Sequence, residues 1–190
     1  MKIILASSSP YRQVLLKRLN LGFTTISPNI DESPNEGENG QGLACRLAEQ
    51  KALAVGQNEP ADTLIIGSDQ VAECDGRLLG KPITEERAIE QLLSLCGKEV
   101  VFHTAMAINH LSRVTLSYVP TRIGLRQMSE AEIVRYVRQD KPLNCSGALK
   151  TEALGISLMT HFSSDDPTAI IGLPLISLCA YLRSAGMAVP

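Results

Sequence analysis

The chain has 190 residues, of which 44% are hydrophobic and 20% are charged, and its 18 Lys and Arg residues nearly balance its 20 Asp and Glu residues. This length can bury one substantial core, which predicts a single domain over residues 1–190. The balanced charge argues against a nucleic-acid-binding surface or a polybasic membrane surface. No apolar run is long enough to span a bilayer, so we expect neither nucleic acid nor membrane as a partner.

The cellular location is predicted from the first residues and the cysteines. The apolar run that starts at Ile3 ends at Ser7-Ser8-Ser9-Pro10, which is too early for the apolar core of a secretion signal. The five cysteines are widely spaced without a C-x-x-C pair, and the three histidines are scattered. This spacing favours reduced thiols over disulfides or a Cys/His metal site. We therefore expect a cytoplasmic protein.

The first half of the chain predicts two buried strands, each beside a helix. Short all-apolar runs predict the strands, and Ser9 with Pro10 forms the start signal of the first helix. A segment rich in Pro, Gly, Asn and Glu predicts a surface loop before the second helix. The expected elements are a strand at 3–5, a helix from Pro10, a loop at 28–42, a helix at 43–55 and a strand at 63–66.

The second half predicts an antiparallel insert followed by further helices. Asp75-Gly76 is a hairpin turn signal, and residues 99–127 are rich in the Val, Ile, Thr and Tyr that favour long strands. The expected helices cover 85–95, a stretch that begins at Ser129, and 174–184. Strands that alternate with helices around this insert predict a mixed α/β fold.

Three serines and an arginine suggest an anion site at the first helix. The segment Ser7-Ser8-Ser9 would place hydroxyl and backbone N–H donors at the positive end of the helix dipole, and Arg12 would add a bidentate phosphate donor. The same residues also fit an ordinary serine-capped helix that binds nothing.

A lysine and an aspartate stand in unusual places. Lys51 falls on the apolar stripe of its predicted helix, where it either extends to the surface or serves a charged partner. Asp69 follows a predicted buried strand, and an acid there needs a cation to offset its desolvation. Gly80-Lys81-Pro82 places a second lysine in a rigid turn.

Seven short segments carry a recognisable pattern along the chain. They are SSSPYR at 7–12, DE at 31–32, RLAEQKA at 46–52, GSDQV at 67–71, GKP at 80–82, CSGALKTEALGISL at 145–158 and DPTAIIGLPL at 166–175. In this order they resemble the Maf family of nucleotide pyrophosphatases. The resemblance implies a cytoplasmic homodimer, a house-cleaning enzyme that hydrolyses non-canonical or modified nucleoside triphosphates to monophosphates and pyrophosphate. It also implies an elongated mixed-sheet α/β fold, similar to inosine triphosphate pyrophosphatases, with the active site in a cleft.

The resemblance also implies roles for individual residues. Asp69 matches the catalytic acid, and Glu32 together with Asp69 matches the site of a divalent metal ion, Mg²⁺ or Mn²⁺. The positions that bind the substrate phosphates match Ser8, Arg12, Lys51 and Lys81.

Three further positions separate the substrate subgroups of the family, and here they are Tyr11, Gln70 and Glu152. This combination resembles the subgroup that acts on 7-methyl-GTP. An aromatic face attracts the cationic methylated ring, and a carboxylate can accept both N1–H and N2–H of guanine. Two alternatives stay open: a pyrophosphatase for UTP and dTTP, and a regulatory protein that affects septum formation. Tyr11 could also be a helix-packing aromatic.

Overall fold

The chain is divided between two compact units in a computed structural model that describes residues 1–190. The first unit contains residues 1–70, 104–119 and 166–190, and the second contains 71–103 and 120–165. The strands are hydrogen-bonded in the order β2-β1-β3-β5-β6-β7, and β4 pairs with β3. Three long strands contribute residues to both units: β3 (Leu64–Cys74), β5 (Glu99–His110) and β6 (Arg113–Leu125).

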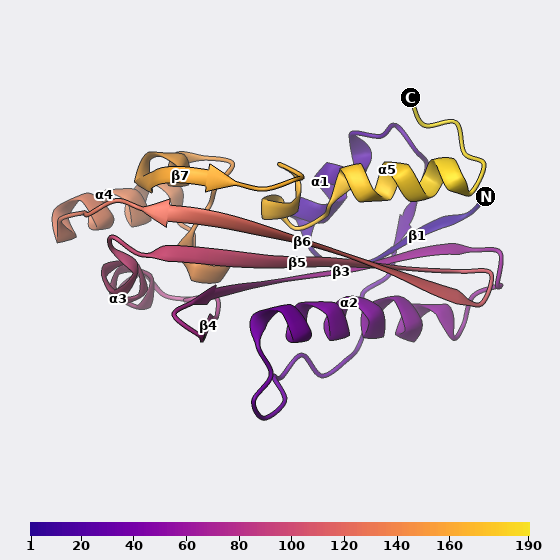
Figure 1. The fold of residues 1–190 in the computed structure, drawn as a ribbon, viewed down its shortest axis with the longest axis horizontal. Coiled ribbons are helices and arrows are strands. Elements are labelled where there is room, and N and C mark those ends of the chain that lie inside the picture. Colours follow the sequence, from indigo (N-terminus) through magenta and orange to yellow (C-terminus); the bar gives the residue numbers. More distant parts are fainter. The chain divides into compact units, whose positions relative to one another are not determined.

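In the first unit, helices cover both faces of a mainly apolar sheet (Figure 1). Strand β1 (Ile3–Ala6) runs parallel to β3, with Ile3 opposite Leu64 and Ala6 opposite Gly67, and parallel to β2 (Thr24–Thr25). Helices α1 (Pro10–Lys17) and α5 (Leu175–Ser184) cover one face, and α2 (Gly40–Gly56) covers the other. Alternate strand side chains share a face, so one set joins the core under α1 and α5. That core includes Ile3, Leu5, Leu15, Leu16, Leu64, Ile66, Leu178 and Leu182.

Two helices of this unit, α1 and α2, begin at capping side chains. The Ser9 side chain accepts a hydrogen bond from the backbone N–H of Arg12, and Pro10 occupies the first turn, as predicted. Helix α2 begins at Gly40, three residues earlier than predicted, because the Asn39 side chain caps it by accepting from the Gly42 N–H. The predicted surface loop is shortened accordingly.

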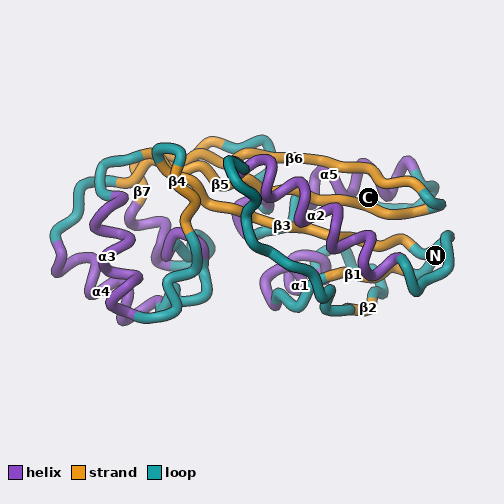
Figure 2. The backbone as a smooth tube through the Cα atoms, turned by 90° about the horizontal axis from the view of Figure 1, so that it is seen from below, coloured by secondary structure: helices purple, strands orange, loops and turns teal.

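The second unit is built around hairpins and a pair of helices. The Asp75-Gly76 turn joins β3 to β4 (Arg77–Leu79), as predicted. Helices α3 (Glu85–Leu95) and α4 (Glu130–Asp140) lie side by side (Figure 2), and a Ser129–Glu132 capping box starts α4. Short 3₁₀ segments at Ser146–Ala148 and Leu154–Leu158 precede β7 (Met159–Ser163), which runs antiparallel to β6.

The α/β prediction with an antiparallel insert is confirmed, and three strands differ from the prediction. Strand β3 continues through Asp69 to Cys74, so Asp69 lies inside a strand and not at its end. The continuation occurs because Val71, Ala72 and Cys74 are buried and the residues beyond Asp69 pair with β4. Strands β2 and β7, which are short and mostly exposed, carry little apolar signal and were not predicted. None of the helices combines the length and hydropathy needed to cross a bilayer.

Candidate active site

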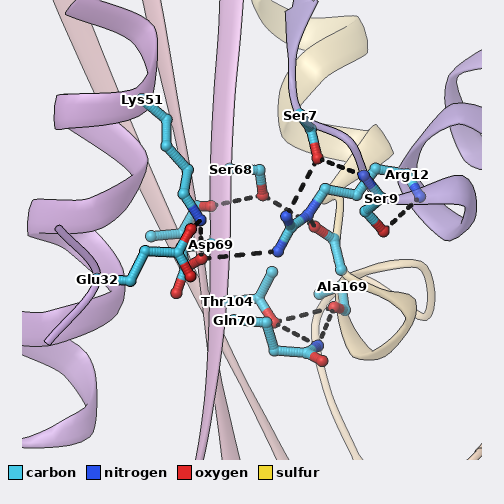
Figure 3. Close-up of polar contacts among 12 residues, drawn as sticks. Ser7, Ser9, Arg12, Glu32, Lys51, Ser68, Asp69, Gln70, Thr104 and Ala169 are labelled. Carbon is cyan, nitrogen blue, oxygen red and sulfur yellow. Dashed lines mark hydrogen bonds and ion pairs between the residues drawn. The ribbon is translucent and has the colours of Figure 1, made fainter. Parts of the chain in front are cut away.

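Lys51 joins two carboxylates in the first unit (Figure 3). Its Nζ lies 2.6 Å from Asp69 Oδ1 and 2.7 Å from Glu32 Oε1. Lys51 and Asp69 are only 5% and 7% exposed, whereas the Glu32 side chain is 60% exposed. Of the two possibilities for Lys51, the structure selects the charged partner: the ammonium points inward to Asp69 and does not extend to the surface.

A close approach of helix to strand makes this ion pair possible. A Cβ atom at Gly67, two residues before Asp69, would lie 2.6 Å from the backbone nitrogen of Ala52 and would also overlap the Ala48 carbonyl. Only glycine allows β3 to lie this close to α2. The Lys51 side chain, on the same segment of α2, can therefore reach Asp69 while its methylenes stay buried.

Arg12 approaches Asp69 from α1. Its Nη2 lies 3.9 Å from Asp69 Oδ1, its Nε donates to the Gly172 carbonyl at 2.9 Å, and its Nη1 donates to Ser7 Oγ at 3.4 Å. Burial lowers the pKa of the Arg12 guanidinium, while the negative charges of Asp69 and Glu32 act in the opposite direction. Arg12 is thus a positioned cation directed at the carboxylate, as Figure 3 shows.

The three serines before α1 have different roles. Ser7 is buried, and its Oγ accepts from the Ser9 N–H at 3.1 Å. Ser9 caps the helix, as predicted. Ser8, the predicted phosphate ligand, is exposed in the turn between β1 and α1. An exposed residue at this helix N-terminus can donate to an incoming anion without breaking the cap.

The residues that flank Asp69 on β3 hold the segment at 169–172. Gln70 Nε2 lies 3.0 Å from Thr104 Oγ1, 2.9 Å from the Ala169 carbonyl and 2.8 Å from the Ile170 carbonyl. The Ser68 hydroxyl lies 2.8 Å from the Gly172 carbonyl. The amide nitrogen of Gln70, a predicted specificity residue, is therefore engaged within the protein.

Sequence reasoning missed Ser68, Thr104 and Gly172. Ser68 and Thr104 are fully buried polar residues in apolar strands, and that contrast is the sequence signal that could have indicated them. Gly172 gives no such signal, because the Arg12 side chain that contacts it is 160 residues away.

The predicted site residues are distributed over both units. Asp69, Lys51, Arg12 and Glu32 converge in the first unit, where Tyr11 is also found, half-buried on α1. Lys81 and Glu152 belong to the second unit. Lys81 is exposed just after β4, and Glu152 is exposed in the turn before the second 3₁₀ segment. The roles predicted for Lys81, Glu152 and Tyr11 stay predictions.

A shallow hollow of about 510 Å³ lies beside the loop that carries Glu32. Loop residues and one side of α2 line it, but Asp69 and Lys51 do not. The lining residues include Asp31, Ser33, Arg46, Gln50 and Leu53. The location of the active site in a cleft stays a prediction.

The carboxylates of Glu32 and Asp69 are the candidate ligands for a divalent metal ion. The structure contains no group of three or more His, Cys, Asp and Glu residues suited to hold an ion. Glu32 and Asp69 nevertheless direct one oxygen each to the same cation, the Lys51 ammonium. One or two carboxylates completed by phosphate and water oxygens is the ligand set that Mg²⁺ commonly takes, so this pair fits such an ion.

Comparisons with known proteins identify the family. The model of the Maf-like protein family matches residues 2–185, which is nearly the whole chain. The chain belongs to the Maf family. The resemblance predicted from the seven motifs is therefore confirmed.

Curated Maf relatives extend this result. A protein of Aromatoleum aromaticum named 7-methyl-GTP pyrophosphatase is 48% identical over 100% of this chain and 98% of its own length. One of Xanthomonas axonopodis pv. citri with the same name is 46% identical, over 100% of this chain and 99% of its own. Among solved structures, the Staphylococcus aureus Ham1 protein shares the fold, with a TM-score of 0.55, 15% identity, and coverage of 97% of this chain and 100% of that one.

Proposed function

We propose that this Maf protein is a nucleoside triphosphate pyrophosphatase that hydrolyses 7-methyl-GTP to 7-methyl-GMP and pyrophosphate. The observation that carries the proposal is the buried Asp69 carboxylate, held 2.6 Å from the Lys51 ammonium with Arg12 beside it. A polyanionic substrate needs such cations, and a water nucleophile needs such a base. The names of relatives that are 45–48% identical over nearly the whole chain support 7-methylguanine as the nucleobase of the substrate.

The proposed reaction assigns one task to each group. Arg12 and Lys51 bind phosphate oxygens, and exposed Ser8 adds a donor at the start of α1. An Asp69 oxygen accepts the proton of a water molecule whose oxygen bonds to the α-phosphorus. The bond from that phosphorus to the α,β-bridging oxygen breaks, and pyrophosphate leaves with the electron pair. Positioned cations favour this step because they stabilise charge that grows on the leaving group.

A divalent metal ion belongs to the same proposal. Glu32 and Asp69 would hold Mg²⁺ or Mn²⁺, and the bound ion would neutralise charge on the phosphates. Lys51, which now bridges the two carboxylates, is then available to the polyphosphate. Lys81 in the second unit is proposed as a further phosphate ligand.

Pyrophosphate release across a panel of nucleotides tests both the reaction and the preference for one nucleobase. We expect turnover of 7-methyl-GTP to exceed that of GTP, UTP and dTTP. Asp69→Asn should abolish turnover, because an amide cannot accept the proton, while nucleotide binding persists. A clear preference for UTP or dTTP would support the alternative subgroup. A rate close to wild type in Asp69→Asn would refute the role of Asp69 as the general base.

Glu152 tests the base preference separately. We propose that its carboxylate accepts N1–H and N2–H of guanine, with Tyr11 stacking on the methylated ring and Gln70 contributing to selectivity. Glu152→Gln should lower kcat/KM for 7-methyl-GTP by about tenfold or more while UTP turnover is little changed. Exposed Glu130→Gln, in the same unit, serves as the control. An unchanged panel for Glu152→Gln would show that this carboxylate does not contact the base.

The homodimer and the cytoplasmic location are also proposals. The homodimer rests on the family resemblance, and the location rests on the resemblance together with the spacing of the cysteines. Sedimentation of the purified protein would test the dimer directly.

A further inference from the structure

A buried carboxylate outside the proposed reaction organises the segment at 166–174, here called the Asp166 loop. Asp166 is 1% exposed. Its Oδ1 accepts from the Thr168 N–H at 2.8 Å and from the Thr168 hydroxyl at 2.6 Å, and its Oδ2 accepts from the Ile176 N–H at 2.7 Å. Asp166 therefore ties the start of the loop to the first turn of α5.

The Thr168 side chain links the beginning of the Asp166 loop to its end. Its hydroxyl oxygen accepts from the Leu175 N–H at 2.9 Å and lies 3.0 Å from the Leu173 carbonyl, a second acceptor for its proton besides Asp166. One side chain thus contacts both ends of the loop. A hydrogen-bond network of this kind, here joining half-buried Thr168 to buried Asp166, restricts the backbone to a single conformation.

The loop presents its carbonyl groups to the candidate active site. Ala169 and Ile170 accept from Gln70, and Gly172 accepts from Arg12 Nε at 2.9 Å. The single proton of the Ser68 hydroxyl has two acceptors, the Gly172 carbonyl at 2.8 Å and the Ala105 carbonyl at 2.7 Å. Gly172 has a φ of +118°, which side chains disfavour, and a Cβ there would lie 3.4 Å from Arg12 Nε. Figure 3 shows this arrangement around Arg12, Ser68 and Gln70.

We propose that Asp166 and Thr168 are positioning residues that fix the Arg12 guanidinium through the Gly172 carbonyl. The inference rests on the proposed function, because it assumes that Arg12 binds the phosphates. A free arginine side chain loses rotamer entropy when it binds a ligand. The loop removes that freedom in advance, so that Nη2 already faces Asp69 when the substrate arrives.

The test compares Thr168→Val, which keeps the shape but removes the hydroxyl, with Thr168→Ser, which keeps the hydroxyl. The probe is 7-methyl-GTP with a methylene α,β-bridge, which cannot be hydrolysed, titrated calorimetrically with Mg²⁺ present. We expect Thr168→Val to raise Kd about tenfold, and Thr168→Ser to stay within about twofold of wild type. Thermal unfolding of each variant reports its folding.

A double-mutant cycle separates positioning from general damage to the fold. In an Arg12→Ala background, Thr168→Val should change Kd by less than about twofold, because the residue it acts through is gone. Loss of affinity that is equal in both backgrounds, or wild-type affinity in Thr168→Val, would overturn the proposal. If Thr168→Val does not fold, Ser68→Ala tests the same carbonyl from the other side and should show the same dependence on Arg12.

The two proposals fail in different ways. A wild-type protein that binds the analogue but releases no pyrophosphate from any nucleotide contradicts the proposed function alone. Additive effects of Thr168→Val and Arg12→Ala on Kd contradict the positioning role alone.

Discussion

Lys51 compensates two negative charges, and one of them is buried. Removing its ammonium in Lys51→Met would leave Arg12, at 3.9 Å, as the only cation within 4 Å of the Asp69 carboxylate. Breaking a buried ion pair from one side costs about 3–5 kcal/mol, because the remaining charge stays desolvated. We therefore expect Lys51→Met to lower the free energy of unfolding by roughly 3 kcal/mol in urea titrations.

Two comparisons make this prediction specific. Lys17→Met, at an exposed position on α1, should change stability by less than about 0.5 kcal/mol. Adding Asp69→Asn to Lys51→Met should recover part of the loss, because no uncompensated charge is then buried. Equal stability of Lys51→Met and wild type would show that Asp69 does not depend on this lysine.

At the scale of elements, the contact between α2 and β3 determines the geometry of the site. Gly67→Ala would place a methyl group against the backbone of α2, 2.6 Å from the Ala52 nitrogen, where no flexible side chain can move aside. Overpacking of this kind costs about 1–3 kcal/mol or more, and separating helix from strand would also move Lys51 away from Asp69. We expect both a lower unfolding midpoint and a large fall in kcat.

Gly22→Ala is the matched control, because a Cβ at Gly22 meets nothing within 4 Å. It should leave the unfolding midpoint and the kcat close to wild type. A Gly67→Ala protein with wild-type stability would mean that α2 can shift without disturbing the strand.

At the scale of the whole molecule, each unit contains an acidic residue whose pKa is strongly lowered. In the first unit, hydrogen bonds from the Arg46 guanidinium and the Asn35 N–H lower the pKa of Glu38 to about 2. In the second unit, the Ser129 N–H and hydroxyl, together with Arg126, lower the pKa of Glu132 to about 2. An unfolded glutamate titrates near 4.5, so the unfolded chain binds more protons between these pH values.

The resulting stability is present above pH 4.5 and is lost as the pH falls towards 2. Glu38→Gln and Glu132→Gln should therefore each flatten the decline of urea midpoints across this window. Salt should weaken the effect more for Glu132, whose side chain is 33% exposed, than for Glu38, whose side chain is 12% exposed. Strands β3, β5 and β6 pass from one unit to the other without a linker. We accordingly expect one cooperative unfolding transition, as the predicted single domain requires, and two separate transitions would contradict this expectation. If the urea midpoints of both variants fall with pH as those of wild type do, the predicted role of the two carboxylates is wrong.

Elements whose signals are local can be predicted from the amino-acid sequence alone. The Ser9 cap, the Asp75-Gly76 turn and the helix start at Ser129 depend on residues a few positions apart, and each lies where the pattern predicts it. The seven motifs likewise identified the Maf family before any contact was known. Short exposed strands and the first turn of α2 escaped prediction because their apolar periodicity is weak.

The way in which the charged residues face one another follows from the folded arrangement of helices and strands, not from any local pattern. The sequence placed Lys51 on an apolar stripe and left its direction open, because helical periodicity does not say which strand lies opposite. The position of Asp69 within β3 and the contact of Arg12 with Gly172 depend on residues brought together by folding. Contacts between residues so far apart in the sequence depend on how helices and strands pack together. Such packing leaves no periodic pattern in the amino-acid sequence.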